Sequence, residues 1–152
     1  MKTQFEILIK SRELVLQVID DLSIEQLHAI PKGFKNNIAW NVAHLVVTQQ
    51  LLHYRLSGTN CLIPEDLIVD FRKGTSPSRK FNDEEFDEIK ELLIALPETL
   101  IEDYEADIFH DYNEYETSTG FVLDSLETAI SFNNFHEGMH LGIIRSIKKL
   151  VK

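Results

Sequence analysis

The spacing of apolar residues constrains this 152-residue chain more than any other feature of its sequence. Four segments place apolar side chains three, four or seven positions apart, a spacing that gathers them on one face of an α-helix. No segment shows the sustained alternation that a half-buried strand requires. The pattern predicts an all-α fold, with helices over roughly residues 3–22, 37–58, 81–97 and 122–150 and a further helical turn at 24–28.

Capping residues mark where two of these helices begin. Asn36 or Asn37 is a good N-cap for the second long helix. Asn82 is followed three residues later by Glu85, a pair that resembles a capping box at the start of the third long helix. Pro97 is expected to end or kink that helix, because proline lacks the backbone N–H that a helix interior needs.

The connections between the helices differ in length and composition. Residues 58–80 are rich in Gly, Pro, Ser and Thr, and they predict a long crossover between the second and third long helices. Residues 98–119 are acidic and rich in Tyr without a clear period, so they are expected to be irregular. The whole chain, 1–152, has the length of a single domain.

Charge and composition narrow the choice of partners and compartment. The formal charge is −10, from 25 acidic and 15 basic residues, which opposes the counterion release that drives nucleic-acid binding. No apolar run approaches the roughly 20 residues of a membrane span. The single Cys61 and the absence of a signal-peptide pattern at the start predict a cytoplasmic protein. The acidic charge argues against a nucleic acid as partner, and the lack of a long apolar run argues against a membrane.

Two histidines of the last helix form the candidate site. His136 and His140 are four residues apart, so their side chains lie on one helical face within reach of a single ion. The same face carries apolar residues above and below them, including Phe132 and Ile144, and therefore points toward the core. Buried imidazoles need partners, which are either hydrogen-bonding groups or a metal ion. Two histidines four residues apart on an apolar face favour a metal ion over hydrogen-bonding groups as the partner.

The segment FHEGMH also matches the H-E-x-x-H pattern of zinc peptidases. Such an enzyme needs a third ligand downstream and uses the glutamate as general base. After His140 only LGIIRSIKKLVK remains, without His, Asp, Glu or Cys, which argues against a peptidase. Glu137 is still the nearest candidate for proton transfer, or for orienting an imidazole through a hydrogen bond. Its position on the helix equally allows it to face solvent or a neighbouring chain.

A third ligand must then come from upstream, and His44 is the best candidate. Trp40 precedes it by one turn and Thr48 follows it by one turn, on a largely apolar face of the second long helix. His53 is nine residues from His44, which places it on the opposite side of that helix. Three hydrogen-bonded core histidines without a metal remain an alternative interpretation.

NNIAWNVAHLV, followed far downstream by SFNNFHEGMHLGII, resembles the DinB-like family of small bacterial four-helix proteins. The family pattern is a Trp four residues before a His, and then H-E-x-x-H-x-G on the last helix. The resemblance covers essentially the whole chain and implies a four-helix bundle with an up-down-down-up course. It also implies a three-histidine site of His44, His136 and His140, usually described with zinc or nickel, and a homodimer.

The resemblance implies a site and leaves the reaction open. Three neutral imidazoles leave a coordination position for water or a substrate, as in catalytic zinc sites. A metal-dependent enzyme acting on a small molecule is one hypothesis, and a thiol-dependent transferase suits the relatives of the fold best. Metal-dependent hydrolysis is the alternative within the enzyme class. A metal-binding helical protein whose ion serves stability or sensing is the hypothesis outside it.

Overall fold

The computed structural model describes residues 1–151, so Lys152, the last residue of the predicted domain, lies outside the described residues. The helices are α1 (Lys2–Ile19), α2 (Ile24–His28), α3 (Ile38–Gln50), α4 (Glu65–Phe71), α5 (Asp83–Glu105) and α6 (Leu126–Lys148). A π-helical turn, η1 (Leu51–Arg55), continues α3, and the short strands β1 (Tyr115–Glu116) and β2 (Val122–Leu123) form a hairpin. The prediction of an all-α fold is confirmed.

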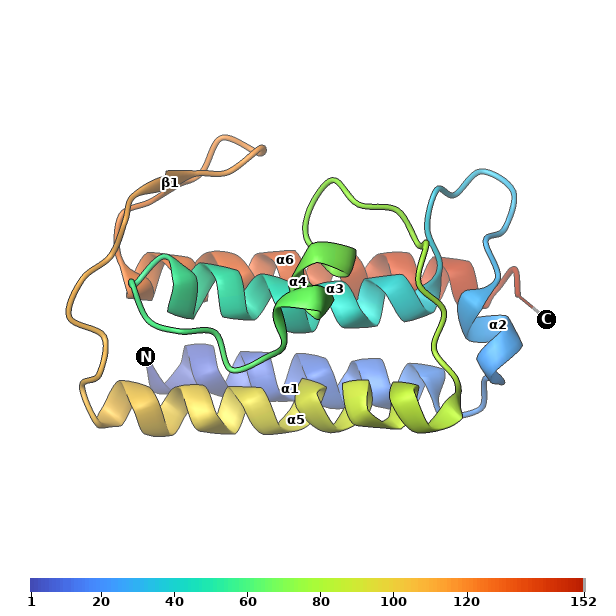
Figure 1. The fold of residues 1–152 in the computed structure, drawn as a ribbon, viewed down its shortest axis with the longest axis horizontal. Coiled ribbons are helices and arrows are strands. Elements are labelled where there is room, and N and C mark those ends of the chain that lie inside the picture. The colour runs from blue at the N-terminus through green and yellow to red at the C-terminus, as the bar shows by residue number, and fades with distance from the viewer. Residues whose placement is uncertain (152) are drawn as a thin grey trace.

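Four long helices lie side by side in two layers (Figure 1). The blue α1 and the yellow α5 form one layer, and α3 and the red α6 form the other. The helices α1 and α6 run in one direction along the molecule, and α3 and α5 run in the opposite direction. Each long helix contacts one neighbour in its own layer and one in the other, and the buried apolar residues lie between the layers.

The predicted helix starts agree with the structure. The Asn37 side chain accepts a hydrogen bond of 2.8 Å from the backbone N–H of Trp40. Asn82 and Glu85 form the predicted capping box at the start of α5, each accepting from the other's backbone N–H at 2.9 Å. These caps satisfy backbone donors that a helix start leaves without partners.

Of the two predicted effects of Pro97, the end of the third long helix is wrong, because α5 continues through the proline to Glu105. Proline at this position leaves the carbonyl of Leu93, four residues earlier, without its helical donor. The buried side chain of Arg12 supplies one, since its Nη1 donates to the Leu93 oxygen at 3.1 Å. Leu96 and Leu100 on either side of the proline are buried, so packing also favours the continued helix.

The connections are more ordered than the sequence predicts. The crossover of residues 58–80 contains α4, and residues 98–119, predicted to be irregular, contain the last turns of α5 and strand β1. Strand β1 pairs with β2 in antiparallel register, with Tyr115 opposite Leu123. Val122, predicted to begin the last helix, belongs to this hairpin, and α6 starts at a capping box formed by Ser125 and Thr128.

Arg12 and Glu137 form an ion pair inside the core. Their side chains are completely buried, and Nη2 of Arg12 lies 2.8 Å from Oε1 of Glu137. Arg12 also donates to the backbone oxygens of Leu93 in α5 and Leu45 in α3. One guanidinium on α1 therefore contacts the other three long helices.

We predict that Arg12→Met lowers the free energy of unfolding by about 3–5 kcal/mol, because it leaves a buried carboxylate without its counter-charge. Part of that loss comes from the Leu93 carbonyl, and Pro97→Ala restores an N–H that can donate to it. Pro97→Ala should therefore stabilise the Arg12→Met variant more than it stabilises the wild type. Urea denaturation of the four proteins measures this coupling.

The exposed Lys10 on the same helix provides the control for Arg12. Lys10→Met should change the free energy of unfolding by less than about 1 kcal/mol. Equal effects of Pro97→Ala in the two backgrounds would contradict the role given to Arg12.

His53 is a further titratable group inside the core, and it has no exposed surface. Burial, and then the charge of Arg12, lower the pKa of His53 to about 3, and the Ala129 carbonyl opposes the shift only in part. A histidine in an unfolded chain titrates near about pH 6.5. Below that pH the unfolded state binds a proton that the folded state does not bind, so folding becomes less favourable.

We predict that His53→Gln removes part of the acid sensitivity of the fold. Between about pH 6.5 and pH 3 the wild type should lose about 1.4 kcal/mol more per pH unit than the variant does. Urea denaturation at pH 7.5 and pH 5 measures the difference. His110→Gln, at an exposed position, is the control and should keep the wild-type dependence. Identical pH dependence in His53→Gln and the wild type would refute the prediction.

Candidate metal centre

Three histidines from two helices converge at one point of the structure. His44 lies on α3, and His136 and His140 lie one turn apart on α6. One ring nitrogen from each lies within 4.8 Å of the others, close enough to hold one metal ion. The Nε2 atoms of His44 and His136 are 3.2 Å apart. Sequence reasoning proposed these three residues as ligands, and the fold brings them together.

Hydrogen bonds orient two of the three rings. Nδ1 of His44 lies 2.6 Å from the carbonyl oxygen of Phe71, and Nδ1 of His140 lies 2.7 Å from Oδ1 of Asn41. Asn41 donates through its Nδ2 to Asn36 and to the Asn37 carbonyl, so its oxygen is the atom left to accept. An acceptor at Nδ1 requires the proton there and leaves the Nε2 lone pair free for an ion.

The surroundings keep the three imidazoles neutral. Burial lowers the pKa of His136 to about 2, with further lowering from the neighbouring His140, His44 and Arg12. Burial and the proximity of His44 lower the pKa of His140 to about 3. Burial also lowers the pKa of His44, while the Phe71 carbonyl acts in the opposite direction. Since neutral imidazole is the form that binds a metal, all three are ready to do so at pH 7.

Trp40 fixes the ring of His44 from one side. The indole stacks on the imidazole with ring centres 4.6 Å apart and an angle of 11° between the planes. Its Nε1 donates to the hydroxyl of Thr75 at 3.1 Å, which ties the stack to the segment after α4. Oγ1 of Thr48 also lies 3.3 Å from Nε2 of His44. The ring has little freedom to leave the cluster.

The histidines form part of the wall of a cavity of about 470 Å³. The residues around them come from α3, η1, α6, the segment after α4 and the β1–β2 hairpin, and include Trp40, Thr48, Leu52, Lys73, Tyr115 and Phe132. The exposed Lys73 and Met139 belong to this lining, so the cavity reaches solvent. The crossover and the hairpin, rather than the helices alone, define the space in front of the three rings.

Glu137 is buried beside Arg12 in the core. Its carboxylate is buried against Arg12, and Asn133 lies 3.4 Å from the same oxygen. Within residues 1–151 it neither lines the cavity nor forms a hydrogen bond with a histidine of the cluster. The possibility that it faces solvent is wrong, because it has no exposed surface.

The remaining histidines lie elsewhere. His53 is buried in the core and does not belong to the cluster, as its position on the helix predicts. His28 contacts the carbonyl of Ile24 at 2.8 Å and accepts from the N–H of Phe81 at 3.0 Å, a structural role. His110 lines a separate cavity of about 390 Å³ near the end of α5.

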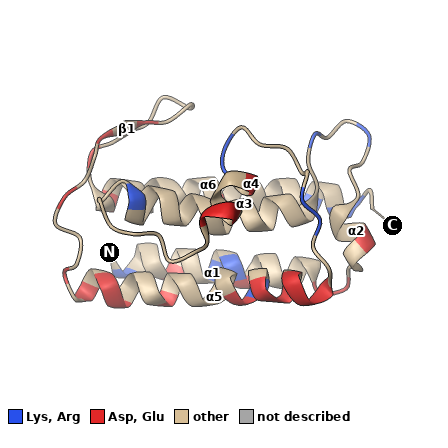
Figure 2. Cartoon of the chain, viewed as in Figure 1, with Lys and Arg blue, Asp and Glu red and all other residues tan. Residues whose placement is uncertain are grey.

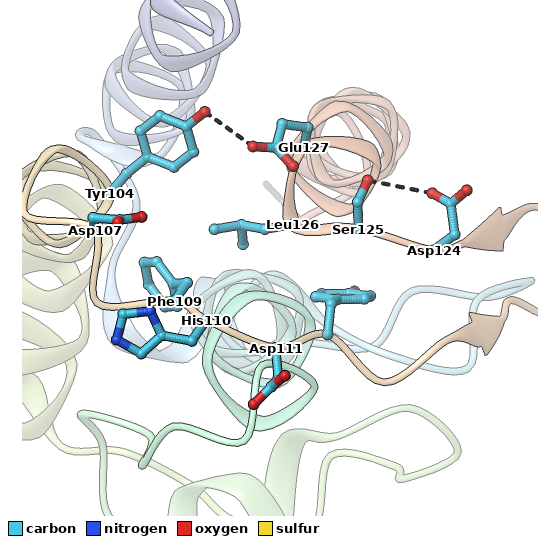
Figure 3. A pocket seen from close by; sticks show the side chains of 10 residues that line it. Tyr104, Asp107, Phe109, His110, Asp111, Asp124, Ser125, Leu126 and Glu127 are labelled. Carbon is cyan, nitrogen blue, oxygen red and sulfur yellow. Dashed lines mark hydrogen bonds between the residues drawn. The ribbon is translucent and has the colours of Figure 1, made fainter.

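That second cavity is polar and has no converging ligands (Figure 3). Tyr104 donates to Glu127 at 3.0 Å, and Ser125 donates to Asp124 at 3.2 Å. The side chains of Asp111 and Asp124 lie on different sides of the space. Among the described residues, the three-histidine cluster is the one set that brings three metal-binding side chains together.

Sequence reasoning missed Asn41 and Phe71, which orient the histidines. Asn41 precedes His44 by three residues, one turn away on the same helix, and a search for polar neighbours at that spacing would have found it. The carbonyl of Phe71 has no signal in the sequence, because its place depends on how α4 packs on α3.

Comparison with known proteins identifies the family of the chain. The family model described as the DinB superfamily matches residues 7–144, nearly the whole chain. The search of curated proteins finds no match. The family match and the resemblance of the two histidine motifs lead to the same conclusion: the chain belongs to the DinB superfamily.

Proposed function

We propose that this protein is a metal-dependent enzyme that acts on a small molecule, and specifically a thiol-dependent transferase with zinc or nickel at His44, His136 and His140. The observation that carries the proposal is the position of the three imidazoles, which converge at the wall of a cavity that reaches solvent. An ion on that wall has room for a further ligand. Sites with three protein ligands and an open position are typical of catalytic rather than structural zinc.

The residues present fit such an ion. His44 and His140 are held with Nδ1 against an acceptor, and all three rings are neutral at pH 7. When bound, the metal would act as a Lewis acid that holds a thiol as its thiolate. The protein's own residues bind the ion and orient the imidazole rings. Phe71, Asn41 and Trp40 fix the rings, and the cavity wall displaces water from the bound molecule.

The alternatives have less support. A metal that served only stability would need no accessible cavity beside it. Hydrolysis favours a general base near the ion, and within residues 1–151 no carboxylate lines the cavity. The catalytic role of Glu137 stays a prediction. Its buried contact with Arg12 supports a positioning role, because it fixes the helix next to His136.

The scaffold and assembly belong to the same proposal. A four-helix bundle with an up-down-down-up course is supported by the directions of α1, α3, α5 and α6 in Figure 1. None of the described helices is long and apolar enough to cross a bilayer. The homodimer, the cytoplasmic location and the absence of a nucleic-acid partner stay predictions.

The first test concerns the metal ligands. His44→Ala, His136→Ala and His140→Ala should each reduce bound zinc or nickel at least about tenfold, because a site with two imidazoles binds far more weakly. His53→Ala is the matched control, a buried histidine on the same continuous helix as His44, and should keep the wild-type metal content. Elemental analysis of purified, tag-free proteins gives the answer. Full metal in all three variants would exclude this site.

The second test separates an enzyme from a metal-stabilised protein. Cobalt in the site should gain an intense near-ultraviolet absorption when 2-mercaptoethanol is added, because the thiolate enters the open position and transfers charge to the metal. Ethanol at the same concentration is the control and should leave the spectrum unchanged. A spectrum that does not respond to the thiol would show that the position is closed, and would favour the non-catalytic alternative.

A further inference from the structure

The cavity has a charge opposite to that of the protein. The chain carries 25 acidic and 15 basic residues. In the described part of the chain, however, the charged side chains that line the cavity are Arg55 and Lys73, and no Asp or Glu joins them. Figure 2 shows Asp and Glu gathered along α5, which does not contribute to the cavity wall. An anion is therefore attracted to the cavity and repelled from much of the surface.

Arg55 reaches the cavity from the π-helical turn η1. The backbone N–H of Leu56 donates to the Leu51 oxygen at 3.1 Å, five residues earlier, and this wider turn brings Arg55 and Leu56 to the wall together with Leu51. Nη2 of Arg55 lies 2.6 Å from Oε2 of Glu65, and the side chain of Arg55 is about half exposed and that of Glu65 about two-thirds exposed. A guanidinium has five N–H donors, so donors remain for a ligand.

Lys73 lines the same cavity from the segment after α4. The next residue, Gly74, has a φ of 88°, a conformation that glycine adopts readily and that turns the chain at the cavity wall. Within residues 1–151, no carboxylate lies within ion-pair distance of the Lys73 ammonium. This cation is available to an incoming molecule.

Apolar side chains line the cavity together with these cations and the histidines. Leu51 and Leu52 come from η1, Leu56 follows it, and Phe132 and Met139 come from α6. A ligand that satisfied all parts of the wall would have a group for the metal, a hydrocarbon body, and a negative charge for the two cations. Burial of each methylene of such a body in the apolar part of the wall strengthens binding.

Building on the proposed function, we propose that the thiol substrate is an anion, a thiol with a carboxylate at the end of an apolar body, and that Arg55 and Lys73 bind this carboxylate. The two cations then decide which thiols the site accepts. Neutral and cationic thiols of the same length cannot form ion pairs with these two cations and bind more weakly.

The experiment compares 6-mercaptohexanoate with 6-mercaptohexanol. Trp40 is the single tryptophan of the chain and lines the cavity, so its fluorescence reports binding in both the metal-free and the metal-loaded protein. The acid should bind at least about fivefold more tightly than the alcohol in both forms, because the preference comes from the protein's own cations. The absorption of the cobalt form reports separately whether the thiol reaches the metal.

Substitutions test which cations produce the preference for the acid. Lys73→Gln and Arg55→Gln should each reduce the preference for the acid, and together they should abolish it. Glu65→Gln should increase the preference, because it frees Arg55 from its partner, an effect that a structural role for Arg55 does not predict. Lys149→Gln removes an exposed cation that does not line the cavity and should have no effect.

The outcomes separate this inference from the function on which it rests. Equal affinity for the acid and the alcohol, or no binding of either, overturns the anion site whatever the cobalt spectrum shows. A preference for the acid that survives the double substitution of Arg55 and Lys73 also overturns it. A preference that depends on both cations, without a change in the cobalt spectrum, keeps the anion site and removes thiol ligation from the proposed function.

Discussion

The buried guanidinium of Arg12 is the interaction on which the arrangement of the helices depends. Arg12 has no exposed surface, and removing such a charge from water is unfavourable unless it is paired and hydrogen-bonded. Four of its five N–H donors reach Glu137 on α6, Leu93 on α5 and Leu45 on α3. These bonds can form together only when the helices have one relative position, so the ion pair favours that packing.

The candidate metal centre follows from the same contact. Leu45 and Glu137 are the residues directly after His44 and His136, so Arg12 holds the backbone beside two of the three ligands. No short segment of the chain joins α3 to α6, because His44 and His136 are 92 residues apart in sequence. The site is thus assembled by the core rather than by a loop, and this gives the imidazoles a fixed separation before an ion arrives.

Features with local causes could be predicted from the sequence, and features with distant causes could not. Periodicity gave the four long helices, and the caps at Asn37 and Asn82 act within three residues. The continuation of α5 through Pro97 needed a donor from Arg12, which lies on another helix. The location of Lys73 on the cavity wall depends on the path of the crossover, and the spacing of apolar residues does not predict such a path.

The central claim is that three imidazoles and an open position bind one ion. X-ray absorption at the zinc edge of the loaded protein tests it most directly, because it reports the type and number of ligand atoms. The account predicts three imidazole nitrogens and one further light atom at about 2.0–2.1 Å, with no sulfur in the protein alone. A sulfur at about 2.3 Å from Cys61, or a shell made only of oxygen atoms, would contradict it.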